Sequence, residues 1–353
     1  MSFTLLLRLV FFLLAALAVA ALSTQNDARP HFVRAQDDPP AVPGPRTTNV
    51  ELVLEDNGKE SLPRLMLPVQ VGSTGATVNT YLSGGNSDCI FSTASFDPTN
   101  STTAIGRQRV FRNPYGGSSS GDLLADTLET GGISISNYTM GSIKGPNRFG
   151  VCGIRWLKEG ATSLFGRSAA YRSFVYPYKS SGAIVRATFG LALDLNGAST
   201  FSLGTSLHEV ASDHWVRVDT EAPGSWSMHG AIAGVADYMT INPAMTSIMV
   251  SPEQATEIMH SIGVVPVVDS NEDVIATYLC TQPPSIVVTI GNVNVSLTRT
   301  VLTYAKDKDG RCILPITGTK GYNDIPMMGT PFIASLKELV FDYDELALGI
   351  VPL

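Results

Sequence analysis

Two short patterns in this sequence contain residues that could act as a nucleophile or bind a metal. The run from Gly117 to Gly121 satisfies the Gly-x-Ser-x-Gly spacing of serine hydrolases, but it has the composition of a polar hairpin tip, and such a serine needs a strand before it and a helix after it. His208, Glu209 and His214 lack the His-Glu-x-x-His spacing that places two zinc ligands on one helix face. No phosphate-binding glycine loop occurs. We therefore expect neither a metal nor a cofactor.

The cysteines point to disulfides. Cys89, Cys152, Cys280 and Cys312 are even in number and lack the Cys-x-x-Cys spacing of a zinc site. Two disulfide bonds and an oxidising compartment are predicted.

The composition of the chain indicates which kind of secondary structure must position these residues. The chain has 353 residues, of which 44% are hydrophobic and 16% charged, enough for a large core in one or two domains. With 32 Gly, 21 Pro and short β-branched apolar runs, the sequence predicts many strands joined by turns and excludes a helical bundle. The net charge of −7 argues against a nucleic-acid partner.

The N-terminus has the features of a signal peptide. Arg8 precedes an apolar run from Leu9 to Leu22, which is shorter than the roughly 20 residues that cross a bilayer. Ala18 and Ala20 form an Ala-x-Ala cleavage pattern, so residues 1–20 are predicted to be removed. The mature protein is then expected to be secreted or to lie in the secretory pathway or vacuole, without membrane attachment.

Further sequence features agree with this location. Asn100, Asn137 and Asn294 begin Asn-x-Ser/Thr sequons and are predicted glycosylation sites. Residues 21–48 are rich in Pro, Asp, Arg and Ala and are predicted to be a leader or flexible arm.

Two local structures are predicted with a physical reason. Strand patterns over residues 50–54 and 65–72, with the turn at residues 56–58 between them, predict a hairpin. Ser251 can cap a helix that has Pro252 in its first turn. Its apolar face would be Ala255, Ile258, Met259 and Ile262, with its end at Gly263.

Eight motifs follow one another at spacings that resemble one known family. They are Leu67–Gly72, Phe96–Thr102, Tyr115–Ser118 with the returning strand Gly121–Thr127, Val151-Cys152-Gly153, Phe201–Gly204, Thr246–Pro252, Met327-Met328-Gly329, and Val340–Asp344 followed by Leu348-Gly349-Ile350. Their order is similar to that of the pepsin-like aspartic peptidases. This resemblance implies an all-β, bilobal pepsin-like fold with few short helices, a central cleft and a flap hairpin. The lobes would span residues 49–190 and 191–353.

The sequence departs from that family where the catalytic acids should be. Pepsin-like enzymes activate a water molecule with two carboxylates that share one proton, one in each Asp-Thr/Ser-Gly loop. Here Leu82 occupies the first Asp position, or Ser83 if the register slides by one residue, and Pro243 occupies the second. The nearest acids, Asp88 and Asp237, are displaced by far more than the roughly 0.5 Å tolerance of a catalytic constellation.

The leading hypothesis is a pepsin-fold protein that no longer cleaves peptides and binds a peptide, a glycan or an apolar small molecule in its cleft, as a monomer. A second hypothesis is a repurposed enzyme that cyclises or isomerises an apolar metabolite in a cleft lined by Leu82, Met245 and Tyr115, with Tyr115 or Ser83 as hydrogen-bond donors. A third is a peptidase with a displaced dyad, and a fourth is a stable fold that binds no ligand. The predicted cleft residues are Ser83, Gly84, Tyr115, Gly116, Asn242, Thr246 and Ser247.

The resemblance also implies how the cysteines pair. The family commonly has a bridge in the region of Cys280 and Cys312. The fold would also bring Cys89, on the strand that leaves the first loop, close to Cys152.

Overall fold

The computed structural model describes residues 46–56, 58, 60–112, 120–145, 150–157, 163, 165, 173–221, 226–320 and 325–353. The predicted signal peptide and most of the predicted leader lie outside these residues. In the described part of the chain, no helix combines the length and the apolar character that crossing a membrane requires.

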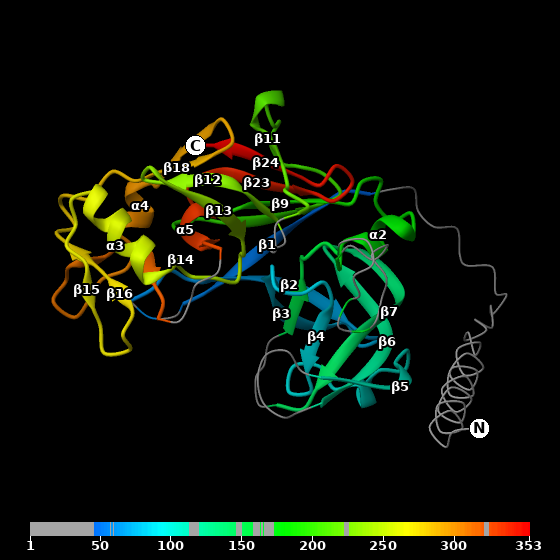
Figure 1. The fold of residues 1–353 in the computed structure, drawn as a ribbon. Helices are drawn as coiled ribbons and strands as arrows, with labels where there is room; N and C mark the ends of the chain where they lie inside the picture. The colour runs from blue at the N-terminus through cyan, green and yellow to red at the C-terminus, as the bar shows by residue number, and fades with distance from the viewer. Residues whose placement is uncertain are drawn as a thin grey trace, which may run out of the picture. The chain divides into compact units, whose positions relative to one another are not determined.

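Strands build the fold, as the all-β prediction states (Figure 1). One sheet contains β1 (Thr48–Glu55), β2 (Arg64–Val71), β3 (Ala76–Ser83), β4 (Cys89–Ser92), β5 (Ile105–Arg112), β6 (Ser120–Thr130), β7 (Ile133–Ile143), β8 (Gly150–Gly153), β9 (Thr188–Ala192), β10 (Ser199–Leu203), β11 (Trp215–Arg217), β23 (Leu336–Asp342) and β24 (Ala347–Pro352).

The C-terminal lobe is built on a second sheet. It contains β12 (Ser227–Ile232), β13 (Val235–Ile241), β14 (Ile248–Val250), β15 (Val267–Val268), β16 (Val274–Ile275), β18 (Val287–Ile290), β19 (Val293–Ser296), β21 (Ile316–Gly318) and β22 (Met327–Met328). A third, small sheet pairs β17 (Thr277–Tyr278) with β20 (Cys312–Ile313). The helices of the described residues are short: α2 (Tyr176–Ser180), α3 (Pro252–Ser261), α4 (Arg299–Leu302) and α5 (Thr330–Ile333), with 3₁₀ turns η1 (Pro98–Asn100) and η2 (Ser212–His214).

Both local predictions are confirmed. β1 pairs with β2, and at the turn between them Gly58 has φ +89° and donates its N–H to Asp56 Oδ1. Ser251 caps α3 through a reciprocal capping box with Gln254. The helix buries Ala255 and the apolar residues one turn further on, as its periodicity predicts.

The large sheet joins distant parts of the chain. Its strand order runs β11-β24-β23-β9-β10-β1-β2, so the C-terminal strand β23 lies between β24 and β9 (Figure 1). β9 spans the predicted lobe boundary between residues 190 and 191 and pairs with β10 and β23, and β10 pairs in turn with β1 of the N-terminal lobe. The two lobes are therefore connected by a continuous hydrogen-bonded sheet.

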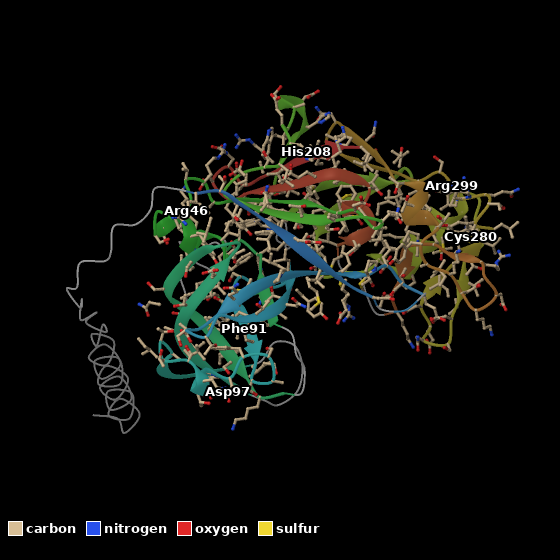
Figure 2. All side chains as sticks on the ribbon, turned by 180° about the vertical axis from the view of Figure 1, so that it is seen from behind. Arg46, Phe91, Asp97, His208, Cys280 and Arg299 are labelled. Carbon is tan, nitrogen blue, oxygen red and sulfur yellow. A yellow bond between two sulfur atoms is a disulfide. The ribbon has the colours of Figure 1, made fainter. Side chains whose placement is uncertain are left out.

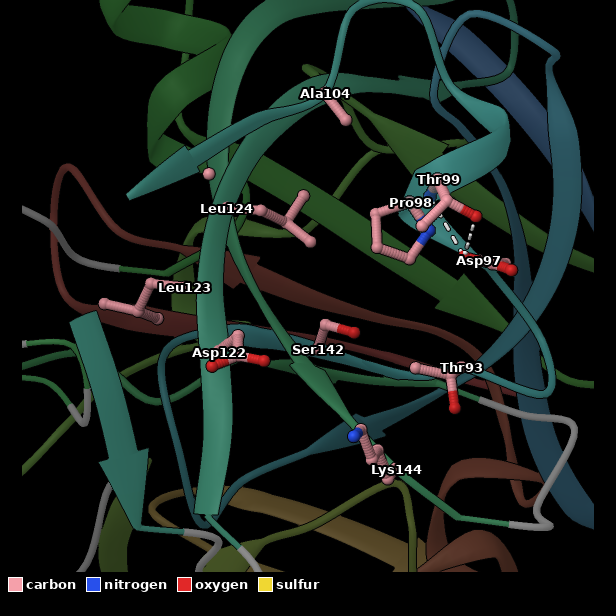
Figure 3. A pocket seen from close by; sticks show the side chains of 11 residues that line it. Thr93, Asp97, Pro98, Thr99, Ala104, Asp122, Leu123, Leu124, Ser142 and Lys144 are labelled. Atoms are coloured by element: carbon pink, nitrogen blue, oxygen red, sulfur yellow. Dashed lines mark hydrogen bonds between the residues drawn. The ribbon is translucent and has the colours of Figure 1, made fainter. Parts of the chain in front are cut away.

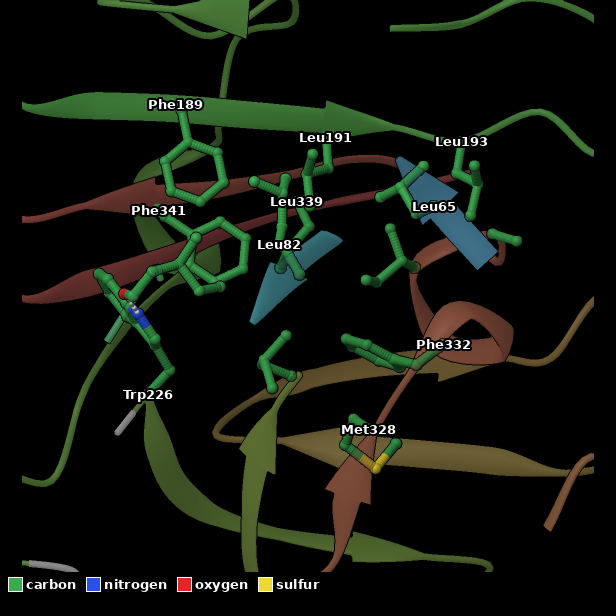
Figure 4. Close-up of a cluster of buried hydrophobic side chains, with 14 of the residues drawn as sticks. Leu65, Leu82, Phe189, Leu191, Leu193, Trp226, Met328, Phe332, Leu339 and Phe341 are labelled. Atoms are coloured by element: carbon green, nitrogen blue, oxygen red, sulfur yellow. Dashed lines mark hydrogen bonds between the residues drawn. The ribbon is translucent and has the colours of Figure 1, made fainter. Parts of the chain in front are cut away.

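Aromatic side chains fill the core behind this sheet (Figure 4). The rings of Phe189 and Phe341 stack at 4.5 Å, and Trp226 packs edge-on against Phe341 at 5.0 Å and Tyr343 at 4.9 Å. Leu82 also belongs to this core and is 0% exposed. Because the contributors come from both lobes, the core holds the two lobes together.

Both predicted disulfides are present. Cys89 bonds to Cys152, directly opposite it on the paired strands β4 and β8. Cys280 bonds to Cys312 in the C-terminal lobe, far from Phe91 and Asp97 of the N-terminal lobe (Figure 2).

Candidate functional site

The first loop of the candidate site follows β3. β3 runs parallel to β8, with Leu82 opposite Cys152 and Ser83 opposite Gly153. A side chain at Gly153 would clash with the backbone of Asn86 in the loop, so only glycine permits this close approach. The Val151-Cys152-Gly153 motif therefore braces the first loop.

The second loop follows β13 and has the same construction. β13 runs parallel to β22, with Ile241 opposite Met328, and Asn242 donates its N–H to the Met328 carbonyl at 3.1 Å. A side chain at Gly329 would clash with the carbonyl oxygen of Met245. The Met327-Met328-Gly329 motif thus braces the second loop as its counterpart braces the first.

The two loops contact each other directly. The Gly84 N–H donates to Asn242 Oδ1 at 3.0 Å, and a Cβ on Gly84 would lie 2.9 Å from the Ile241 carbonyl oxygen. Ser83 Oγ accepts from the Gly85 N–H at 3.2 Å, and Asn242 Oδ1 accepts from the Ala244 N–H at 3.3 Å. In each loop, therefore, the first side chain accepts from the amide two residues further on.

This construction places Ser83 and Asn242 at matching positions. The parallel pairing relates Leu82 to Ile241 and Pro243 to Gly84, and does not relate Leu82 to Pro243. Of the two registers left open by the sequence, the one that starts the loop at Ser83 fits the pairing. Leu82 does not line the site, because successive strand residues face opposite sides and its side chain lies in the core (Figure 4).

A buried network connects the loops from behind. The Ile154 N–H donates to the Ser83 carbonyl at 2.9 Å, and the Ile154 carbonyl accepts from Trp226 Nε1 at 2.6 Å and from the Tyr343 hydroxyl at 2.8 Å. The Trp226 carbonyl accepts from the Ile241 N–H at 3.3 Å. Trp226 has φ +57°, which is rare for a bulky side chain and is maintained by these contacts on both sides.

Tyr81 is a neighbour of the site that the sequence analysis did not identify. It lies two residues before Ser83 and so shares a strand face with it. Its hydroxyl donates to Glu55 Oε2 at 2.6 Å, and the Arg64 guanidinium lies 5.6 Å from its ring centroid. Burial, followed by the bond to Glu55, raises the pKa of Tyr81. Because strand residues two positions apart face the same side, the position of Tyr81 relative to Ser83 could have identified it from the sequence.

Neither of the displaced acids, Asp88 and Asp237, occupies one of the two matching loop positions. Asp88 is fully buried. Asp237 accepts from the Tyr238 N–H at 2.6 Å and from the side chain of Gln254, the residue of the α3 capping box.

The remaining predicted residues are placed as follows. Thr246 and Ser247 are half-buried in the second loop, while Tyr115 and Gly116 lie outside the described residues. Within the described part of the chain, no cluster of three His, Cys, Asp or Glu side chains is arranged to hold a metal ion.

Comparison with known families agrees with the paired-loop architecture. The family model described as eukaryotic aspartyl protease matches residues 69–353. The chain belongs to this family of pepsin-like proteins. No curated protein matches the chain.

Proposed function

We propose that this chain is a secreted, non-proteolytic member of the pepsin-like family that binds a peptide, a glycan or an apolar small molecule at the paired loops. The observation that carries the proposal is the neutral Ser83 and Asn242 pair at the two matching loop positions, with Gly84 bonded to Asn242 Oδ1.

Neutral groups at these positions cannot perform the chemistry of an aspartic dyad. That chemistry needs one carboxylate to accept a proton from water while its partner, which holds the shared proton, polarises the substrate carbonyl. Neither a serine hydroxyl nor a carboxamide ionises between pH 3 and 7. Asp237 does not substitute for the missing base, because its carboxylate is bonded at the start of α3.

The architecture of the two loops is nevertheless intact, which supports a role in binding. Both bracing glycines, the contact of Gly84 with Ile241 and the bonds to Asn242 Oδ1 are present without any acid. Polar backbone and side-chain groups near the loops would then orient a ligand whose apolar parts are buried.

The test for proteolysis uses the purified mature protein and a denatured protein substrate at pH 3 to 6, with and without a transition-state-mimicking aspartic peptidase inhibitor. We expect no inhibitor-sensitive cleavage from the wild type. A Ser83→Ala, Asn242→Ala variant purified in the same way measures any contaminating peptidase. Inhibitor-sensitive cleavage by the wild type above this background would contradict the proposal.

The test for binding is a thermal-shift screen with separate sets of peptides, oligosaccharides and apolar metabolites. A ligand present at a hundred times its Kd stabilises the native state by about 2.7 kcal/mol. A stabilising ligand should lose its effect when Asn242→Ala removes the acceptor that joins the loops. If all three sets leave the melting temperature unchanged, the binding part of the proposal fails.

A further inference from the structure

A groove of about 970 Å³ lies on the N-terminal lobe, and none of its lining residues belongs to the two loops (Figure 3). One wall is formed by η1 and its cap, where Thr99 and Asp97 lie, and the other by β6 and the end of β7, where Asp122, Ser142 and Lys144 lie. Asp122 and Ser142 are directly opposite each other on the paired strands. The groove is therefore framed by a rigid sheet and a short turn.

The lining combines apolar surface with polar groups of several kinds. Leu124 and Pro98 supply apolar surface, and the hydroxyls, carboxylates and ammonium can both donate and accept hydrogen bonds. Asp122 and Lys144 are exposed, and neither forms an ion pair with a described residue. Hydrogen bonds from the Thr99 amide and hydroxyl to Asp97 Oδ1 lower the pKa of that carboxyl. Asp97 thus stays an acceptor in mildly acidic solution.

A carbohydrate attachment point borders this groove. Asn100 begins the sequon Asn100-Ser101-Thr102, is exposed and directly follows the groove residue Thr99. Because consecutive Cα atoms are ~3.8 Å apart, the backbone of Asn100 lies next to the edge of the groove.

The attachment point is also held in place. The Asn100 N–H donates to the Asp97 carbonyl at 3.1 Å, Ser101 Oγ accepts from the Ser73 N–H at 3.0 Å, and Ser73 Oγ accepts from the Thr102 N–H at 2.8 Å. A fixed base lowers the entropy lost when the attached glycan adopts one orientation.

From this juxtaposition we propose that the groove is the binding seat of the N-linked glycan on Asn100. The N-acetylglucosamine residues nearest the protein lie against Leu124 and Pro98, with their hydroxyl and acetamide groups bonded to Asp122, Ser142 and Lys144. This inference rests on the secretion in the proposed function but not on the state of the two loops. Asn137 and Asn294 are also exposed, yet neither this groove nor the smaller groove around residues 192–196 is lined by a residue adjacent to them. They serve as internal controls.

The test uses the full chain secreted from a eukaryotic host. Peptide N-glycosidase is added to the folded protein in ¹⁸O water, and release at each site is followed by mass spectrometry of the Asn-to-Asp conversion. We expect release at Asn100 to be about tenfold slower than at Asn137 and Asn294, which corresponds to about 1.4 kcal/mol of protection. After denaturation the three rates should become equal.

Variants of the groove distinguish binding of the glycan in the groove from a rigid backbone around Asn100 as the cause of slow release. Asp122→Ala with Lys144→Ala changes only exposed side chains and should raise the release rate at Asn100 to that of the other two sites. The matched control Asp213→Ala with Lys308→Ala, at exposed residues that do not line the groove, should leave it unchanged.

Three results would overturn the inference: an unmodified Asn100, equal release at all three sites in the folded wild type, or slow release at Asn100 that the groove variant does not change. None of them bears on whether the protein cleaves peptides or binds a ligand at the loops, which the protease assay and the thermal-shift screen decide separately.

Discussion

At the scale of single residues, the position of each side chain on β3 determines what it can do. Leu82 and Ser83 are neighbours, yet Leu82 is 0% exposed in the core while Ser83, at 7%, accepts from the Gly85 N–H within the first loop. An acid at Leu82 would face hydrocarbon, whereas an acid at Ser83 would accept hydrogen bonds from loop amides. The two substitutions should therefore have different consequences.

We expect Leu82→Asp to destabilise the fold by about 4 kcal/mol or more, because it buries an uncompensated carboxyl group and removes core packing. The double variant Ser83→Asp, Asn242→Asp should remain folded. Urea unfolding of both proteins at one pH measures the difference. Equal stability of the two variants would contradict the assignment of the first loop position to Ser83.

The double variant should also gain a pH dependence that the wild type lacks at these neutral positions. Two adjacent carboxylates favour sharing one proton, which raises the pKa of one of them above its unfolded value. The folded state then binds more protons than the unfolded state, so its free energy of unfolding falls as the pH rises through that raised pKa. Unfolding at pH 4 and pH 7, compared with the wild type, checks this; an identical pH dependence in both proteins would contradict it.

At the scale of elements, a buried glutamate in β23 holds the segment that follows β10. Glu338 is 0% exposed; its Oε1 accepts from the Leu207 N–H at 2.8 Å and its Oε2 from the His208 N–H at 2.8 Å. A side chain at Gly190 on the neighbouring strand would clash with this carboxylate. The carboxylate thus fixes the start of the connection from β10 to β11.

Glu338→Gln should cost about 2–4 kcal/mol although it preserves shape. The amide can accept from one of the two backbone N–H groups but presents a donor to the other, so a buried donor loses its partner. Glu345→Gln, at an exposed residue nearby, is the matched control and should change stability by less than about 0.5 kcal/mol. The midpoints of denaturant unfolding measure the stability of the two variants. Equal midpoints would mean that Glu338 does not hold this segment.

The two disulfides should differ in the order of their reduction. Both sulfurs of the Cys89–Cys152 bridge belong to fully buried residues, whereas Cys280 is partly exposed. A mild reductant applied to the folded protein should therefore open the Cys280–Cys312 bridge first. Alkylation followed by mass mapping measures the order, and earlier modification of Cys89 and Cys152 would refute it.

At the scale of the whole molecule, one backbone carbonyl links the lobes. The Ile154 carbonyl, next to the brace of the first loop, accepts from Trp226 and Tyr343 of the C-terminal lobe. Two donors on a single buried carbonyl make the link redundant, because either one alone still satisfies it.

Trp226→Phe and Tyr343→Phe should each cost about 1 kcal/mol for the lost hydrogen bond, apart from packing changes. The double variant should cost more than the sum of the two, by about 1–3 kcal/mol, since the buried carbonyl is then left without a donor. A double-mutant cycle of unfolding free energies gives this coupling directly. Simple additivity would mean that the two donors act independently.

Features that depend on local rules could be predicted from the sequence. The turn at Gly58 and the cap at Ser251 follow from bonds between residues a few positions apart. The order of motifs was sufficient to predict the bilobal β fold, and it implied both disulfide pairings. The turn and the cap depend only on neighbouring residues, and the fold and the disulfide pairings were implied by the resemblance to a family.

The loop register, the network behind it and the anchoring of Glu338 were decided by tertiary structure. Whether Leu82 or Ser83 starts the first loop depends on which residue lies opposite Gly153 on β8, far away in the sequence. Trp226 and Glu338 acquire their roles from partners that only the folded chain brings within hydrogen-bond distance. The sequence by itself determined the elements and their order, because local bonding and periodicity specify them; the site was decided by long-range strand pairing, in which a shift of one residue turns a side chain from the site into the core.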